Sequence, residues 1–246
     1  FEDLEEKLAD PQTTLMILCN PHNPVGRIWS REELAKVGEL CKKYHVTVVS
    51  DEIHCDLTSP GRSYVPFASV SDECRDNCII CMAPTKTFNL AGLQTAAVAV
   101  PDPVLRHKVR QGLNTDEVSG ANCFAVDAAI AAYTEGGPWL DQLREYVQEN
   151  KKVSERFLEK EIPQIKAVCS EATYLMWLDC RELRNGGAGF AEYLRERTGL
   201  FVSKGEQYGK SGEGFLRVNA ACPRSVLEDG LRRLAEGAAA FERVFQ

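Results

Sequence analysis

The fold is decided by residues 14–26, Thr-Leu-Met-Ile-Leu-Cys-Asn-Pro-His-Asn-Pro-Val-Gly. The apolar run Thr14–Cys19 predicts a buried strand, and the turn-rich segment Asn20–Gly26 follows it. Ser30 and Glu33 come next, and their spacing predicts a helix that begins with a capping box. A strand, a turn and a helix in this order are typical of a parallel sheet with right-handed crossovers.

Further strands of the same sheet are predicted by three apolar runs, Val46–Val49, Cys78–Met82 and Ala96–Val100. After Pro103 the pattern changes to longer helices and shorter strands. The helices predicted there are Ala121–Tyr133, Trp139–Glu161, Phe190–Arg197 and Ser225–Arg243, and the strands are Ile165–Cys169, Tyr174–Asp179, Leu200–Ser203 and Phe215–Asn219. In Trp139–Glu161 the expected apolar face carries Leu140, Leu143, Val147, Val153 and Phe157.

The order of these elements predicts an α/β fold with a mainly parallel sheet, followed by a smaller α+β domain. We expect residues 1–138 to form part of a large domain and residues 163–246 to form the small C-terminal domain. Residues 139–162 would be the helix that joins them.

Composition excludes several classes of protein. The net charge of −7 over 246 residues and the lack of a dense Lys/Arg stripe argue against nucleic-acid binding. No apolar run approaches the roughly 20 residues that span a bilayer. No signal sequence indicates an oxidising compartment, so we expect reduced thiols and a cytoplasmic location.

Three of the ten cysteines allow an alternative interpretation, as ligands of an iron–sulfur cluster. Cys74, Cys78 and Cys81 have the spacing of an iron–sulfur triad, but Cys81 falls inside a predicted strand, and buried thiols are the favoured interpretation, without a metal. We also expect burial for the cysteines within or beside apolar stretches, which are Cys19, Cys41, Cys81, Cys123, Cys169 and Cys180.

Three polar residues stand at the ends of predicted strands: Asn23, Asp51 and Lys86. Open α/β sheets bind ligands at the carboxyl ends of their strands. An amide, a carboxylate and a lysine suit a cationic ring that carries a phenolate and an imine, which describes pyridoxal phosphate. Each residue alone has a plainer interpretation: a turn residue for Asn23, a helix cap for Asp51 and a surface lysine for Lys86. Their combination favours the cofactor.

Several motifs occur in the order and spacing of a known family: Asn20–Gly26, Asp51–His54, Thr85–Gln94, Ala132-Tyr133 with Trp139-Leu140, Tyr174–Asp179, and Gly214–Asn219 with Cys222–Arg224. The chain resembles the fold-type I aminotransferase superfamily of pyridoxal-phosphate enzymes. Within it, the chain is similar to the C–S lyase branch of MalY/PatB-type cystathionine β-lyases. The resemblance covers nearly all of the chain.

The resemblance implies a role for each motif residue. Lys86 would be the Schiff-base lysine and the base that moves the substrate α-proton. Asp51 would pair with the pyridinium nitrogen and Asn23 with the phenolate, and Thr85 would share the phosphate contacts. Arg217 would bind the substrate α-carboxylate through a two-pronged salt bridge.

Departures from the aminotransferase pattern favour lyase activity. His54 stands where aminotransferases have a cofactor-binding tyrosine, Ala83 where they often have a phosphate-binding serine, and Gln94 where they have an arginine. The resemblance therefore implies β-cleavage of cystathionine or a related sulfur amino acid to thiol, pyruvate and ammonia. Two alternatives stay open: an aminotransferase of the same fold, and an aminotransferase-like effector domain of a transcription regulator.

The chain resembles the C-terminal two thirds of such an enzyme, and family members are homodimers. In the family, a preceding stretch carries the glycine-rich phosphate turn and the aromatic residue that stacks on the ring. We therefore expect residues 1–246 alone to be a poor catalyst that tends to associate.

Overall fold

The computed structural model describes residues 1–244, which form two compact units. The first unit contains Phe1–His22 and Arg27–Gln142, and the second contains Asn23–Gly26 and the chain from Leu143 onward. The domain boundaries expected from the sequence stay a prediction.

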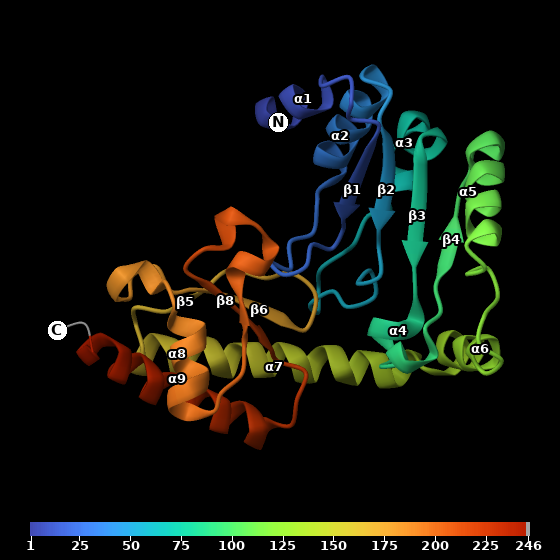
Figure 1. The fold of residues 1–246 in the computed structure, drawn as a ribbon. Coiled ribbons are helices and arrows are strands. Elements are labelled where there is room, and N and C mark those ends of the chain that lie inside the picture. Colours follow the sequence, from blue (N-terminus) through green and yellow to red (C-terminus); the bar gives the residue numbers. More distant parts are fainter. Residues whose placement is uncertain (245–246) are drawn as a thin grey trace. The chain divides into compact units, whose positions relative to one another are not determined.

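The first unit is built on a four-stranded sheet with the order β1-β2-β3-β4 (Figure 1). Its strands are β1 (Leu15–Cys19), β2 (Thr47–Asp51), β3 (Cys78–Met82) and β4 (Ala97–Ala99). β1, β2 and β3 run parallel, and β4 pairs with β3 in the antiparallel sense. The predicted α/β class with a mainly parallel sheet is confirmed.

The helices of this unit were predicted in part. They are α1 (Glu2–Leu8), α2 (Arg31–Lys43), α3 (Asp72–Asp76), α4 (Pro84–Thr87), α5 (Pro103–Thr115), α6 (Ala125–Glu135) and the first residues of α7 (Gly137–Glu161), with 3-10 turns at Phe67–Ser69 and Ala91–Leu93. The capping box of Ser30 and Glu33 at the start of α2 is confirmed. The sequence patterns did not predict α1, α3, α4 or α5.

The core of the first unit lies on one face of its sheet. Leu34 and Val37 of α2 are buried there against Leu18 of β1 and Val48 of β2. Side chains alternate between faces along a strand, so the odd-numbered residues of β1 point the other way. Ile17 is 68% exposed on that second face, although its apolar run predicted burial on both sides.

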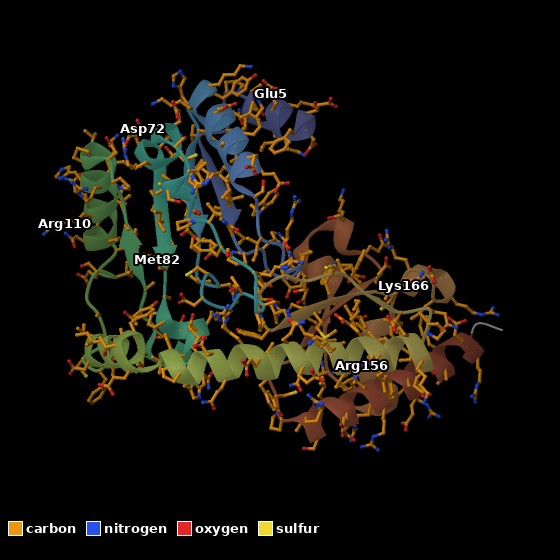
Figure 2. All side chains as sticks on the ribbon, turned by 180° about the vertical axis from the view of Figure 1, so that it is seen from behind. Glu5, Asp72, Met82, Arg110, Arg156 and Lys166 are labelled. Atoms are coloured by element: carbon orange, nitrogen blue, oxygen red, sulfur yellow. The ribbon has the colours of Figure 1, made fainter. Side chains whose placement is uncertain are left out.

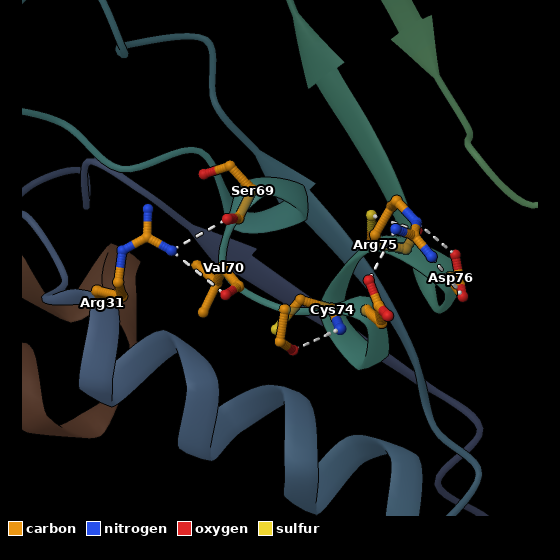
Figure 3. Close-up of polar contacts among 9 residues, drawn as sticks. Arg31, Ser69, Val70, Cys74, Arg75 and Asp76 are labelled. Atoms are coloured by element: carbon orange, nitrogen blue, oxygen red, sulfur yellow. Dashed lines mark hydrogen bonds and ion pairs between the residues drawn. The ribbon is translucent and has the colours of Figure 1, made fainter.

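Two of the three cysteines with the iron–sulfur spacing pack in the core. Cys74 and Cys78 are fully buried in the core, and Cys81 is half-buried. Figure 3 shows how Cys74 sits in α3, where the Ser71 hydroxyl accepts a hydrogen bond from its backbone N–H at 3.3 Å. Arg31 of α2 donates beside it to the carbonyls of Ser69 and Val70.

Within residues 1–244 no group of His, Cys, Asp or Glu is arranged to hold a metal ion. Cys41 and Cys180 are buried as expected, and Cys19 is half-buried. The prediction of burial was wrong for Cys123 and Cys169, which are exposed, because both lie in loops beside rather than within the regular elements.

The second unit has an antiparallel sheet with the order β5-β6-β8-β7. Its strands are β5 (Lys166–Ala167), β6 (Leu175–Asp179), β7 (Ser203–Lys204) and β8 (Phe215–Asn219), joined by α8 (Phe190–Thr198), α9 (Arg224–Val244) and 3-10 turns at Arg184–Gly187, Gly205–Tyr208 and Lys210–Gly212. The core contains Leu178 of β6, Leu194 of α8 and Phe241 of α9. A smaller α+β unit was predicted here and is found.

The predicted strand Leu200–Ser203 was mostly wrong. α8 ends at Thr198, and the chain turns at the C-cap residue Gly199, which has a φ of 72°. Phe201 is consequently 70% exposed, and pairing begins only at Ser203.

Helix α7 buries a row different from the predicted one. Its buried residues are Val147, Asn150, Lys151, Ser154 and Leu158, while the other predicted apolar positions, Leu140, Leu143, Val153 and Phe157, are half-buried. Arg156, labelled in Figure 2, lies on the exposed side of the same helix. None of the described helices is long and apolar enough to cross a membrane.

Candidate active site

Asp51 is the last residue of β2, at the carboxyl end of the parallel strands. The register pairs it with Cys19 on β1 and with Cys81 on β3, so the three side chains lie on one face of the sheet. The half-buried carboxylate accepts a hydrogen bond from the Ile53 N–H at 3.3 Å and faces the Cys19 thiol at 3.7 Å. No cation pairs with it in the described part of the chain.

Lys86 follows the neighbouring strand. β3 ends at Met82 (Figure 2), Ala83 caps α4, and Pro84 occupies its first turn, where the missing N–H costs nothing. The strands are adjacent, since the Glu52 N–H donates to the Cys81 carbonyl at 2.9 Å. Lys86 is half-buried, and among residues 1–244 its amine has no ion-pair partner. The structure therefore brings Asp51 and Lys86 to neighbouring strand ends.

The turn of α4 that carries Lys86 is anchored by the next residue. Thr87 is fully buried, and its hydroxyl donates to Asp56 Oδ2 at 3.1 Å. Phe88 extends the anchor, with its ring 5.6 Å from that of Tyr133 and in edge-to-face contact. The sequence gives no sign of this anchor, because Thr87 and Asp56 are 31 positions apart.

His54 and Thr85 differ in exposure. His54 is 4% exposed, in the turn that follows β2, and Thr85 is half-buried in the first turn of α4. Both remain near the predicted strand ends. Their contact with a cofactor stays a prediction.

Asn23 and Arg217 lie together in the second unit. The peptide bonds Asn20–Pro21 and Asn23–Pro24 are both cis. Asn23 Oδ1 accepts a hydrogen bond from Arg217 Nη1 at 3.4 Å. From the sequence we grouped Asn23 with Asp51 and Lys86. The contact between Asn23 and Arg217 spans 194 positions and leaves no sign in the sequence.

Arg217 of β8 is held by its neighbours without a carboxylate. Nη2 donates to the Ser203 hydroxyl at 3.3 Å, and the guanidinium lies 5.1 Å from the centre of the Tyr208 ring. Ser203 on β7 is the register partner of Arg217, so knowledge of the strand pairing would have predicted the contact between Ser203 and Arg217. Within residues 1–244 no acid neutralises Arg217, and its charge is available to an anion.

The pKa values of His22, next to Asn23, and of Cys81, next to Asp51, are shifted. Burial and the charge of Arg27 lower the pKa of His22, which keeps its imidazole neutral at pH 7. Burial and the Asp51 carboxylate raise the pKa of Cys81, so this residue stays a thiol beside Asp51.

Comparison with known proteins finds one family along nearly the whole chain. A model of the family described as Aminotransferase class I and II matches residues 1–234. The cystathionine beta-lyase PatB of Bacillus subtilis (strain 168) is 49% identical over 234 residues, which are 95% of this chain and 60% of that protein.

Solved structures agree. A PLP-bound putative aminotransferase from Clostridium difficile 630 superposes with a TM-score of 0.92 at 38% identity, over 96% of this chain and 61% of that one. Cystalysin from Treponema denticola, which contains a pyridoxal 5'-phosphate cofactor, gives a TM-score of 0.91 at 33% identity, over 97% and 61% of the two chains. The chain thus spans about 60% of the length of the curated relatives it matches.

Proposed function

Because the chain belongs to the aminotransferase class I and II family, we propose that the protein is a pyridoxal-phosphate-dependent C–S β-lyase. Its substrate is cystathionine or a related sulfur amino acid, and its products are a thiol, pyruvate and ammonia. The 49% identity to a cystathionine beta-lyase supports this choice within the family.

The observation that carries the proposal is a set of charges without partners. The Lys86 amine and the Asp51 carboxylate follow neighbouring parallel strands, and in the described residues neither is paired with the other or with another charge. A half-buried carboxylate is costly without a cation, and a ring N–H⁺ is a suitable one. With the Asn23 amide as a donor, these groups fit pyridoxal phosphate.

The residues act on the cofactor and on the substrate separately. Asp51 would hold the proton on the ring nitrogen, and the Asn23 amide would donate to the phenolate oxygen. Thr85 would contact the phosphate, and His54 would contact the remaining edge of the cofactor. When bound, pyridoxal phosphate supplies an electron sink for the electrons released at the substrate Cα.

Lys86 and Arg217 would handle the substrate. Lys86 Nζ would hold the cofactor through its amine and would act as the base that takes the proton from the substrate Cα. The Arg217 guanidinium binds the α-carboxylate through two parallel hydrogen bonds. The C–S bond electrons leave with the thiolate, and the three-carbon remainder hydrolyses to pyruvate and ammonia.

The test compares two lysine variants. Protein loaded with pyridoxal phosphate is reduced with borohydride, and its peptides are analysed by mass spectrometry. The cofactor mass should stay on the peptide with Lys86, and Lys86→Ala should lose both this adduct and pyruvate release from cystathionine. Lys108→Ala, at an exposed lysine of α5, is the matched control and should change neither. An adduct that persists in Lys86→Ala would sink the assignment.

An aminotransferase is the second candidate, because a putative aminotransferase is 38% identical to this chain. Product analysis separates the two reactions. A lyase releases thiol and pyruvate without a co-substrate, whereas an aminotransferase converts its substrate to the keto acid only when a 2-oxoacid accepts the amine.

We further place the protein in the cytoplasm as a homodimer. The dimer is an expectation from the family, and sedimentation of the loaded protein tests it. A monomer that retains full lyase activity would contradict it.

A further inference from the structure

Lys151 is a charged side chain buried in the second unit, and the proposed function gives it no role. It lies on α7 and is only 2% exposed. Its Nζ donates to the Thr173 carbonyl at 2.7 Å, to the Ser170 hydroxyl at 3.0 Å and to the Ala172 carbonyl at 3.1 Å. All three oxygens belong to one short segment, residues 170–173.

The electrostatics of this lysine depend on those oxygens. No carboxylate forms an ion pair with Lys151 in residues 1–244, and burial lowers the pKa of its amine to about 8. Glu155 on the same helix and Cys169 before the segment favour the charged form. A buried ammonium without an anion is expensive, so the hydrogen bonds to residues 170–173 are what holds it in place.

The segment 170–173 in turn holds the turn that carries Asn23. The backbone N–H groups of Glu171 and Ala172 both donate to the Gly26 carbonyl, at 2.8 and 2.9 Å. Gly26 is buried with a φ of +75°, and a Cβ there would lie 2.6 Å from the Ala172 carbonyl oxygen. The segment is therefore packed directly on the backbone of Gly26, three residues after Asn23.

Asn150, the residue before Lys151, holds the chain that follows the strand of Arg217. Asn150 Nδ2 donates to the carbonyls of Ala220 at 2.8 Å and Cys222 at 3.0 Å, just after β8. One turn of α7 thus holds the segment under Asn23 and the chain that follows Arg217. Asn23 and Arg217 then meet at 3.4 Å.

We propose that Lys151 is a positioning residue that fixes the Asn23–Gly26 turn through residues 170–173. Only the contact of Asn23 with the cofactor rests on the proposed function. The position of the Asn23–Gly26 turn is a property of the chain itself. A residue that merely stabilised the unit would act equally on all of its elements.

Amide hydrogen exchange of the full chain without cofactor tests the placement. In Lys151→Met the amides of Glu171, Ala172 and residues 25–27 should exchange about tenfold faster, while β6, β8 and α9 keep their protection. Lys152→Met is the matched control, the same change at the next, exposed position of α7, and should leave the pattern intact. A uniform loss of protection across the unit, or unchanged exchange at residues 25–27, would overturn the proposal.

A milder variant covers the case in which Lys151→Met does not fold. Ser170→Ala removes one of the three acceptors and keeps the lysine, and it should raise exchange at the same amides by a smaller factor. No increase at those amides would contradict the proposal equally.

Cofactor titration connects the placement to function. The affinity for pyridoxal phosphate should fall about tenfold in Lys151→Met, the cost of misplacing one hydrogen bond to a charged group, and not in Lys152→Met. If the unaltered protein binds no pyridoxal phosphate, the proposed function fails, and the exchange pattern still decides the role of Lys151.

Discussion

Replacing Gly26 by alanine should destabilise the second unit by about 3 kcal/mol, and the structure separates this into two causes. Gly26 has a φ of +75°, where an L-residue costs about 1 kcal/mol. The added Cβ would also overlap the Ser170 hydroxyl and crowd the Ala172 carbonyl. Moving the segment away breaks the two hydrogen bonds to the Gly26 carbonyl, each worth about 1 kcal/mol.

Gly189→Ala isolates the backbone cost. Gly189 lies in the same unit with a φ of +74°, and nothing stands within 4 Å of a Cβ built on it. This control should therefore lose only about 1 kcal/mol. The difference between the two variants, about 2 kcal/mol, measures the contact between Gly26 and the segment.

Urea unfolding followed by Trp177 fluorescence provides the assay. Trp177 lies on β6 of the second unit and stacks on Phe215 with ring centres 5.1 Å apart. Replacing Trp29 and Trp139 by phenylalanine in every protein compared leaves Trp177 as the only indole, and the background cancels. Equal losses of unfolding free energy in Gly26→Ala and Gly189→Ala would refute the close packing described above.

Three further predictions concern charge, anchoring and thiol access. The pKa of Lys151 is lowered from 10.5 to about 8, so between these two values the unfolded chain binds more protons than the folded chain. The unfolding free energy, measured by urea titration at both ends of this pH window, should therefore rise with pH by about 3 kcal/mol relative to Lys151→Met. Parallel pH profiles of the two proteins would contradict this. Thr87→Val keeps the shape but removes the hydroxyl bonded to Asp56, and it should cost the first unit about 2 kcal/mol and speed exchange at the amides of α4, which an unchanged exchange rate would exclude. In pulsed alkylation, the exposed Cys123 should react in the folded protein, whereas Cys41, which is fully buried and has a pKa raised to about 11, should react only on unfolding. Equal labelling of both thiols would show that the alkylating reagent reaches the core of the first unit.

Much of the first unit could be predicted from local signals. β1, β2 and β3 lie within one or two residues of their apolar runs, and the capping box marks the start of α2. These elements are determined by side-chain periodicity and by hydrogen bonds between near neighbours, which are visible in any short window. Prediction failed where the local signal was weak, as in α5, whose thirteen residues include no buried side chain.

The candidate site was predicted as residues and not as an arrangement. Asp51 and Lys86 follow neighbouring strands, as expected from a parallel sheet. Asn23 groups instead with Arg217, because its turn is held by backbone bonds to residues 171 and 172. The assignment of Asn23, Asp51, His54, Thr85, Lys86 and Arg217 to cofactor and substrate stays a prediction.

The sequence by itself determined the α/β class, the strand ends and the types of residue that stand there, since periodicity and turn chemistry are local properties of the chain. Only the tertiary structure decided that α7 buries Asn150 and Lys151 and that Gly26 is packed against residues 170–173. Buried polar side chains look like surface residues in a sequence, because their partners are carbonyls whose position depends on the path of distant loops. The contacts that hold Asn23 in place therefore became visible only in the folded chain.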